Sequence, residues 1–136
     1  MVKAFGHINI GVKDLDKAID FYSKILGLDF AFQIKNEEGE IVVTYMSTPD
    51  GKFVELIHAK KMPEDKKAFH NAHMCFEVDD LEAAMNFLKE NNVEIVGGPR
   101  QGRDKNHQCF ITDPDGNRIE LMQMHPESPQ RESQKK

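Results

Sequence analysis

The chain has 136 residues, 39% of them hydrophobic, and a net charge of −5, so it is long enough to bury one core without disulfides. Its two cysteines, Cys75 and Cys109, form no C-x-x-C pattern, which argues against a disulfide framework or a cysteine zinc site and fits a reducing cytoplasm. Acidic and basic residues are interspersed along the chain, so it has no basic patch for nucleic acid. No apolar window approaches the roughly 18 residues of a membrane span. We therefore expect a cytoplasmic protein that acts on a small molecule, with no nucleic-acid or membrane partner.

The first half of the chain predicts a strand, a helix and three further strands. Apolar and polar residues alternate over 5–12, which indicates a half-buried strand. A helix is predicted to begin after the N-cap Asp14 and to end near Gly27. A shorter strand near 28–34 and two strands joined by a tight turn at 49–51 follow. The helix prediction rests on apolar residues that fall on one face, Leu15, Ala18, Ile19 and Tyr22.

The second half repeats this order. A strand is predicted over 72–78, a helix after the N-cap Asp80, and a short strand over 93–96. A loop rich in glycine and charge at 97–106 and a hairpin with its turn at 114–116 complete the copy. The apolar face of the helix recurs at one constant offset, as Leu81, Ala84, Met85 and Leu88. This recurrence indicates a duplicated structural unit.

We predict an α+β fold made of two βαβββ modules, at residues 4–59 and 71–124. Placed edge to edge, they would make a curved eight-stranded mixed sheet with the helices on its convex face. A charged, proline-bearing linker at 60–70 joins them within a single domain, residues 1–125. The tail at 126–136 has almost no apolar residues and is predicted to be disordered.

Each module carries one histidine in its first strand and one glutamate in its last strand: His7 and Glu55, then His73 and Glu120. Strand alternation places all four side chains on the face away from the helices, because their neighbours in sequence are apolar. Any one of them alone is more typical of a solvated residue. Their recurrence at equivalent places predicts a four-ligand site for one divalent metal such as Ni²⁺, Co²⁺, Zn²⁺ or Fe²⁺.

Other polar residues are weaker candidates for binding a substrate. Asn9 shares the strand face of His7, and three cations lie in the predicted loop at 97–106. These cations, Arg100, Arg103 and Lys105, would suit a carboxylate or phosphate, although a solvated charged loop is the more usual explanation for any one of them. Three further histidines are expected to be solvated, His58, His70 and His125.

The strand histidine followed by D-L-x-x-A-x-x-F, together with D-P-D-G-x-x-I-E-L, resembles the vicinal oxygen chelate superfamily over residues 5–124. That superfamily includes glyoxalase I, extradiol dioxygenases, methylmalonyl-CoA epimerase, fosfomycin resistance enzymes and bleomycin-binding proteins. The order His, Glu, His, Glu is most similar to bacterial glyoxalase I. The resemblance implies that the four residues above are the metal ligands, that nickel or cobalt is favoured over zinc, iron or manganese, and that the enzyme is a homodimer.

The resemblance also implies an activity. A glyoxalase I converts the hemithioacetal of a 2-oxoaldehyde into a 2-hydroxyacyl thioester through a metal-stabilised enediolate, a route for methylglyoxal detoxification. By this analogy Glu120 is the first choice as catalytic base and Glu55 the second. Gly11 stands where glyoxalase I has an arginine that helps to hold glutathione, so the identity of the thiol does not carry over.

Three alternatives remain open at this point. An extradiol dioxygenase would use two histidines and one carboxylate, His7, His73 and Glu120. An acyl-CoA epimerase would use the same enolate chemistry with a more basic entrance. A drug-resistance protein would bind a small molecule without any reaction.

Overall fold

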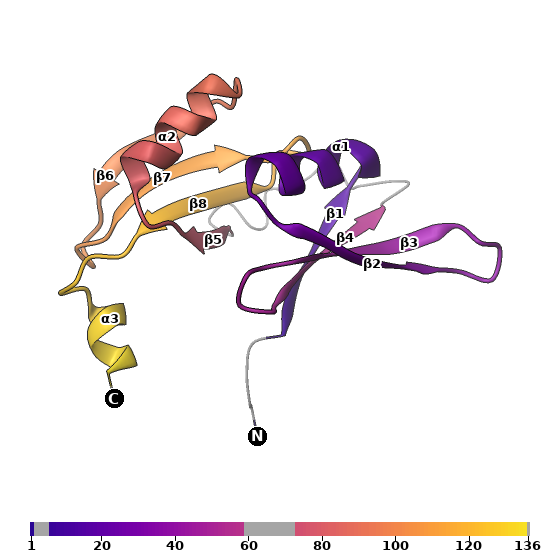
Figure 1. The fold of residues 1–136 in the computed structure, drawn as a ribbon, viewed down its shortest axis with the longest axis horizontal. Helices are drawn as coiled ribbons and strands as arrows, with labels where there is room; N and C mark the ends of the chain where they lie inside the picture. Colours follow the sequence, from indigo (N-terminus) through magenta and orange to yellow (C-terminus); the bar gives the residue numbers. More distant parts are fainter. Residues whose placement is uncertain (2–5, 59–72, 136) are drawn as a thin grey trace. The chain divides into compact units, whose positions relative to one another are not determined.

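The computed structural model describes residues 1, 6–58 and 73–135 of the chain. It divides into two compact units, Met1–Ala68 and Phe69–Lys136. Each unit builds its own four-stranded sheet with a helix beside it (Figure 1). The prediction of one eight-stranded sheet is therefore corrected to two sheets, because the backbone hydrogen bonds of each βαβββ module close within that module. The predicted linker at 60–70 lies outside the described residues.

The first unit has the predicted order of elements and the strand order β1-β4-β3-β2. The helix begins as predicted, since the Asp14 side chain accepts a hydrogen bond from the Lys17 amide at 3.1 Å. After six residues it continues as a π-helical segment, and Gly27 follows with a φ of 69°. The elements are β1 His7–Val12, α1 Leu15–Asp20, η1 Phe21–Ile25, β2 Asp29–Lys35, β3 Ile41–Ser47 and β4 Phe53–His58.

The second unit repeats the topology with the order β5-β8-β7-β6. Asp80 caps its helix by accepting a hydrogen bond from the Ala83 amide at 2.9 Å. The elements are β5 Met74–Glu77, α2 Leu81–Glu90, β6 Gly97–Gln101, β7 His107–Thr112, β8 Arg118–Gln123 and α3 Pro129–Gln134.

Two segments of the second unit differ from the sequence-based expectation. The strand predicted at 93–96 lies further on, as β6, because pairing with β7 begins where the Val96 amide donates to the Phe110 carbonyl at 2.8 Å. The tail predicted to be disordered contains α3. Polar contacts, in place of apolar side chains, hold this helix to the rest of the unit: Arg131 donates to Glu77 at 2.9 Å, and Gln130 donates to Asp104 at 2.7 Å.

Each unit has its own apolar core between the helix and the sheet. In both, the apolar residues that flank the glutamate of the last strand are buried, as the alternation predicted. The fully or nearly buried hydrophobic residues are Val12, Ala18, Tyr22, Leu28, Met46, Val54 and Leu56 in the first unit, and Met74, Leu81, Leu88, Cys109, Phe110, Ile111, Ile119 and Leu121 in the second. Among the described residues, no helix is long and apolar enough to cross a membrane.

The first and last strands of each module lie side by side and run parallel. In the first unit this register pairs Asn9 with Glu55, and in the second it pairs Cys75 with Glu120. Parallel pairing in this register places each module's strand histidine next to its glutamate on one face. The sheets thus position the two predicted ligand pairs in equivalent ways.

Candidate functional site

The first predicted pair lies on β1 and β4. His7 Nε2 is 3.5 Å from Glu55 Oε2. The histidine side chain is half exposed, whereas the Glu55 residue is only 6% exposed. A nearly buried carboxylate beside an accessible imidazole places two metal-type donor groups next to each other.

The second pair repeats this geometry with His73, the residue just before β5, and Glu120 on β8. His73 Nε2 is 2.8 Å from Glu120 Oε2, and the Glu120 residue is only 8% exposed. The His73 imidazole and the Phe110 ring pack edge to face, with centroids 5.6 Å apart and an interplanar angle of 80°. This contact orients the His73 ring toward the carboxylate.

The donor separations test whether such pairs suit a metal. Two ligands that each lie about 2.0–2.1 Å from one ion are about 2.9 Å apart at a right angle and about 3.4 Å apart at a tetrahedral angle. The two observed separations, 2.8 and 3.5 Å, match these values. The structure brings together two donors in each unit, and among the described residues no three His, Cys, Asp or Glu side chains gather into one metal-binding group.

Glu55 is held by more than its histidine. Tyr45, its cross-strand partner on β3, donates a hydrogen bond to the carboxylate, and Asn9 Nδ2 donates to Oε2 at 2.9 Å. These two bonds, with a smaller contribution from His7, hold the pKa of Glu55 below its usual value despite burial. The same hydrogen bond raises the pKa of Tyr45, because the hydroxyl proton is shared with a carboxylate.

Glu120 is held from the neighbouring strand β7 by a different side chain. In the amide orientation that satisfies both of its neighbours, Gln108 donates to Glu120 Oε1 at 2.8 Å and accepts from Arg100 Nε at 3.2 Å. The guanidinium of Arg100 also lies over the Phe110 ring, 5.6 Å from its centroid. The second carboxylate is therefore connected through one amide to a cation.

Cys75 shares the face of His73 and pairs with Glu120 across the parallel strands. The residue is exposed as a whole. Burial of its sulfur among neighbouring atoms, and then the Glu120 carboxylate, raise the pKa of the thiol to about 12. A thiol with so high a pKa is a neutral neighbour of the pair and a poor nucleophile.

The predicted substrate-binding residues take different places in the structure. Asn9 donates directly to Glu55, whereas Arg100 on β6 contacts Gln108 and is connected to the second pair only through that amide. Lys105 pairs with Glu127 at 3.2 Å instead, in the turn after β6, and Arg103 lies in the same turn.

The histidines expected to be solvated differ in where they lie. His58 Nε2 is 3.2 Å from the Lys13 carbonyl, and His125 Nδ1 accepts from the Glu127 amide at 3.1 Å. His70 lies outside the described residues. Neither His58 nor His125 belongs to the two ligand pairs: His58 ends β4 and contacts a carbonyl beside the end of β1, and His125 contacts a residue two positions along the chain.

Sequence reasoning missed Tyr45, Gln108 and Phe110, which hold or orient the predicted ligands. All three lie on the third strand of a module. Tyr45 and Phe110 are directly opposite a glutamate of the fourth strand, and Gln108 is two residues before Phe110 on the same face. Counting residues back through each hairpin turn would have placed them on the same face. The available signal was the register of the hairpins.

The chain is similar in sequence to known proteins over most of its length. A family model described as Glyoxalase/Bleomycin resistance protein/Dioxygenase superfamily matches residues 4–121. The chain is 32% identical over 124 residues to a metallothiol transferase FosB of Staphylococcus haemolyticus, covering 89% of this chain and 84% of that protein. It is also 32% identical over 122 residues to a probable lactoylglutathione lyase of Vibrio parahaemolyticus, covering 86% and 88%.

Solved structures agree with the sequence comparison. A glyoxalase/dioxygenase from Nostoc punctiforme superposes with a TM-score of 0.70 at 26% identity, covering 88% of this chain and 89% of that one. The residues that the family model matches, 4–121, include all four predicted ligands. The chain therefore belongs to the Glyoxalase/Bleomycin resistance protein/Dioxygenase superfamily, the vicinal oxygen chelate superfamily.

Proposed function

We propose that the protein is a divalent-metal-dependent lyase of the glyoxalase I type, which converts the hemithioacetal of a 2-oxoaldehyde into a 2-hydroxyacyl thioester. The observation that carries this proposal is the pair of equivalent His–Glu contacts, each with a buried carboxylate and an accessible imidazole. The similarity to a probable lactoylglutathione lyase supports it. The metal ligands in this proposal are His7, Glu55, His73 and Glu120.

A divalent ion bound by these donors would supply Lewis acidity to the substrate oxygens. Two imidazoles and two carboxylates suit nickel or cobalt, and also zinc, iron or manganese. The proton chemistry falls to the carboxylates of the chain. One carboxylate oxygen of Glu120 takes the carbon-bound proton of the hemithioacetal and returns it to the neighbouring carbon, while the hydroxyl proton of the first carbon moves to the oxygen of the second, so the isomerisation takes up and releases no net proton.

The four-donor set separates this proposal from an extradiol dioxygenase. An oxygenase needs open positions for catechol and oxygen and uses two histidines with one carboxylate. Glu55 would then be unnecessary, yet it is buried and held by two hydrogen bonds. A carboxylate held in this way is expected to bind the metal as a fourth ligand, so we favour the lyase.

A second function is favoured by a specific observation. The similarity to a metallothiol transferase is as strong as that to the lyase, at 32% identity for both. Such an enzyme would use the same metal to direct a thiol to an electrophile. Both reactions need a metal and a thiol, so assays of one protein preparation can separate them.

The test begins with metal content. Protein purified without a chelator or affinity tag should hold about one divalent ion per chain by mass spectrometry, and the double variant His7→Ala/Glu120→Gln should lose it. The double variant His58→Ala/Glu38→Gln removes the same kinds of groups outside the pairs and should keep the metal. Absence of metal from reconstituted wild-type protein would refute the proposal.

The reaction is tested with the metal-loaded protein. Methylglyoxal is mixed with glutathione, cysteine or coenzyme A, and thioester formation is followed by absorbance and mass spectrometry. Fosfomycin, whose resistance enzymes belong to the superfamily, is mixed with the same thiols in parallel. A 2-hydroxyacyl thioester supports the lyase, and a thiol adduct of the drug supports the transferase.

We also propose a homodimer, as the family resemblance implies, in the cytoplasm, as the cysteine pattern predicts. Two inactive variants, His7→Ala/Glu55→Gln and His73→Ala/Glu120→Gln, can be mixed and allowed to exchange subunits. If the two ligand pairs of a site come from different subunits, a mixed dimer has one intact site, and activity returns. If they come from one chain, activity stays absent. Sedimentation of the wild-type protein measures the dimer independently.

A further inference from the structure

The two buried glutamates look equivalent by topology, but the structure holds them by different means. Glu55 receives neutral donors from strands on either side: Asn9 on β1 and Tyr45 on β3. Glu120 receives the amide of Gln108, which is itself bound to Arg100. The two modules therefore share the positions of the predicted ligands but differ in the residues that support them.

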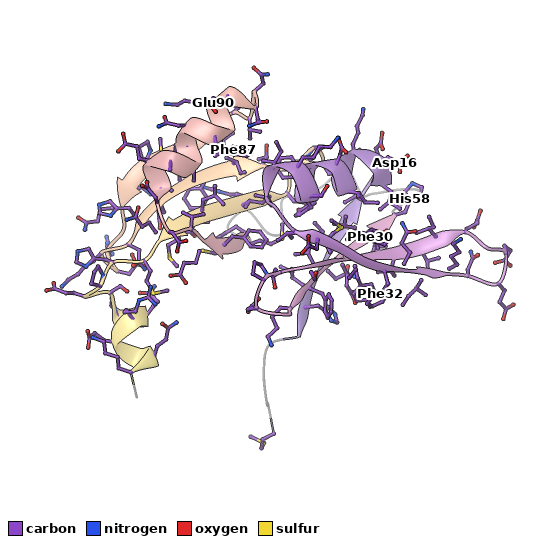
Figure 2. The ribbon with its side chains drawn as sticks, in the orientation of Figure 1. Asp16, Phe30, Phe32, His58, Phe87 and Glu90 are labelled. Atoms are coloured by element: carbon purple, nitrogen blue, oxygen red, sulfur yellow. The ribbon has the colours of Figure 1, made fainter. Side chains whose placement is uncertain are left out.

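The Tyr45 ring is fixed in place by aromatic neighbours. It stacks on Phe32 with centroids 4.3 Å apart and an interplanar angle of 16°, and it meets Phe53 edge to face at 5.7 Å. Phe32 and Phe30 lie on opposite sides of β2, because the register shifts between them (Figure 2). The shift turns Phe32 toward the face that carries Glu55. A ring held in this way directs its hydroxyl to one place.

The bonds to Glu55 act on the ligand oxygen itself. Asn9 donates to Oε2, the same oxygen that faces His7 Nε2. With Tyr45 as a second donor, the carboxylate is held in a single orientation. Such support favours a ligand that stays on the metal through the reaction, since neighbours that orient a ligand raise metal affinity.

Glu120 divides its two oxygens between different partners. Oε2 faces His73, and Oε1 accepts from Gln108. The Gln108 amide therefore sets the rotation of the carboxylate plane, and Arg100 fixes the amide by binding its oxygen. A base that must leave the metal and meet a carbon-bound proton needs its orientation defined by a group other than the metal.

We propose that Tyr45 is the positioning residue that keeps Glu55 as a permanent metal ligand, and that Gln108, anchored by Arg100, positions Glu120 for proton transfer. This inference rests on the proposed function of the His–Glu pairs. It changes the predicted role of Arg100 from binding substrate to positioning Gln108. It also breaks the symmetry between the two glutamates, with Glu120 as the base.

The test compares metal affinity with turnover. Tyr45→Phe keeps the ring stack and removes only the hydroxyl, so metal affinity measured by competition with a chromophoric chelator should fall about 10- to 100-fold. Its kcat at saturating metal should stay within about threefold of the wild-type value. Gln108→Met should show the opposite pattern: near wild-type metal affinity and a kcat about 10- to 100-fold lower.

Matched controls remove the same groups elsewhere. Tyr22→Phe removes the hydroxyl of the other tyrosine in the chain, a fully buried residue. Gln33→Met removes a side-chain hydrogen bond of 3.1 Å to Thr44 in the first unit. Both controls should keep metal affinity and kcat, even if they lower the unfolding free energy of the metal-free protein.

Arg100→Met should lower kcat in the same direction as Gln108→Met but by less, because the amide remains and only loses its anchor. Equal metal affinity of Tyr45→Phe and the wild-type protein would overturn the role of Tyr45. A Gln108→Met variant that loses affinity and kcat together, or neither, would overturn the role of Gln108. Failure of the wild-type protein to bind metal would instead refute the proposed function.

Discussion

The turn between β6 and β7 contains a buried amide that links the hairpin to its surroundings. Asn106 is fully buried, its Nδ2 donates to Asp104 Oδ2 at 2.9 Å, and its Oδ1 accepts from the His125 amide at 2.8 Å. This hairpin carries Arg100 and Gln108 to Glu120. The substitution Asn106→Asp keeps the shape of the side chain but places a second carboxyl group beside Asp104.

The structure sets the size of the effect. Two charged oxygens about 2.9 Å apart repel by about 6 kcal/mol at an effective dielectric constant of 20, so the folded variant takes up a proton instead. Carboxyl protonation costs about 1.4 kcal/mol for each pH unit above the ordinary Asp pKa of 3.8. The maximum destabilisation is therefore about 5 kcal/mol at a pH of about 7.5 and about 1.6 kcal/mol at a pH of about 5.

The sign of the pH dependence follows from the shared proton. In the Asn106→Asp variant, the carboxyl groups at positions 104 and 106 share a proton that has a raised folded-state pKa. The stability of the variant relative to the wild-type protein is therefore greatest at low pH and is lost as the pH rises through that pKa. Urea unfolding followed by circular dichroism at both pH values measures the difference. Asn36→Asp is the control, because Asn36 donates to Glu40 at 3.1 Å in an exposed turn, and its cost should stay below about 1 kcal/mol. An Asn106→Asp deficit that is the same at both pH values would refute this reasoning.

Three further predictions test the supports of the site. Gly98→Ala should lower the free energy of unfolding, measured by urea titration, by about 2 kcal/mol or more beyond the loss caused by Gly51→Ala. Both glycines have a positive φ, but a Cβ at Gly98 would lie 2.7 Å from a backbone oxygen of β7, whereas a Cβ at Gly51 would meet open space. Equal losses in the two variants would contradict the steric argument. Cys75 has a thiol pKa of about 12, so iodoacetamide should alkylate it at least about 100-fold more slowly in the folded protein than in urea, by peptide mass spectrometry; similar rates would show an ordinary thiol. Hydrogen bonds from Tyr45 and Asn9 lower the pKa of Glu55 below its usual 4.5, so the ionised carboxylate stabilises the metal-free fold above that pH, and this stability is lost as the pH falls through the folded-state pKa. In urea titrations at several acid pH values, the free energy of unfolding of Tyr45→Phe should therefore fall less steeply with decreasing pH than that of the wild-type protein. Identical slopes would refute the coupling.

Local patterns in the sequence were enough for the modules and their ligand faces. Period-two alternation around Glu55 and Glu120 placed the flanking apolar residues in the cores and the carboxylates on the opposite face. The N-caps Asp14 and Asp80 were confirmed for the same reason, since a cap acts within one helical turn. Features that depend on residues within a few positions of one another can be read from a single sequence.

The tertiary structure decided what depends on contacts distant in sequence. The start of β6 was misplaced because pairing with β7, and not the apolar content of 93–96, sets it. The helix α3 depends on Glu77 and Asp104, which lie far from it in the chain. The support of the two glutamates, by Tyr45 in one module and by Gln108 in the other, follows from hairpin register and side-chain direction. The sequence by itself predicted which residues bind a metal, whereas only the folded strands decided how each carboxylate is held, because a hydrogen bond requires two groups to meet in space.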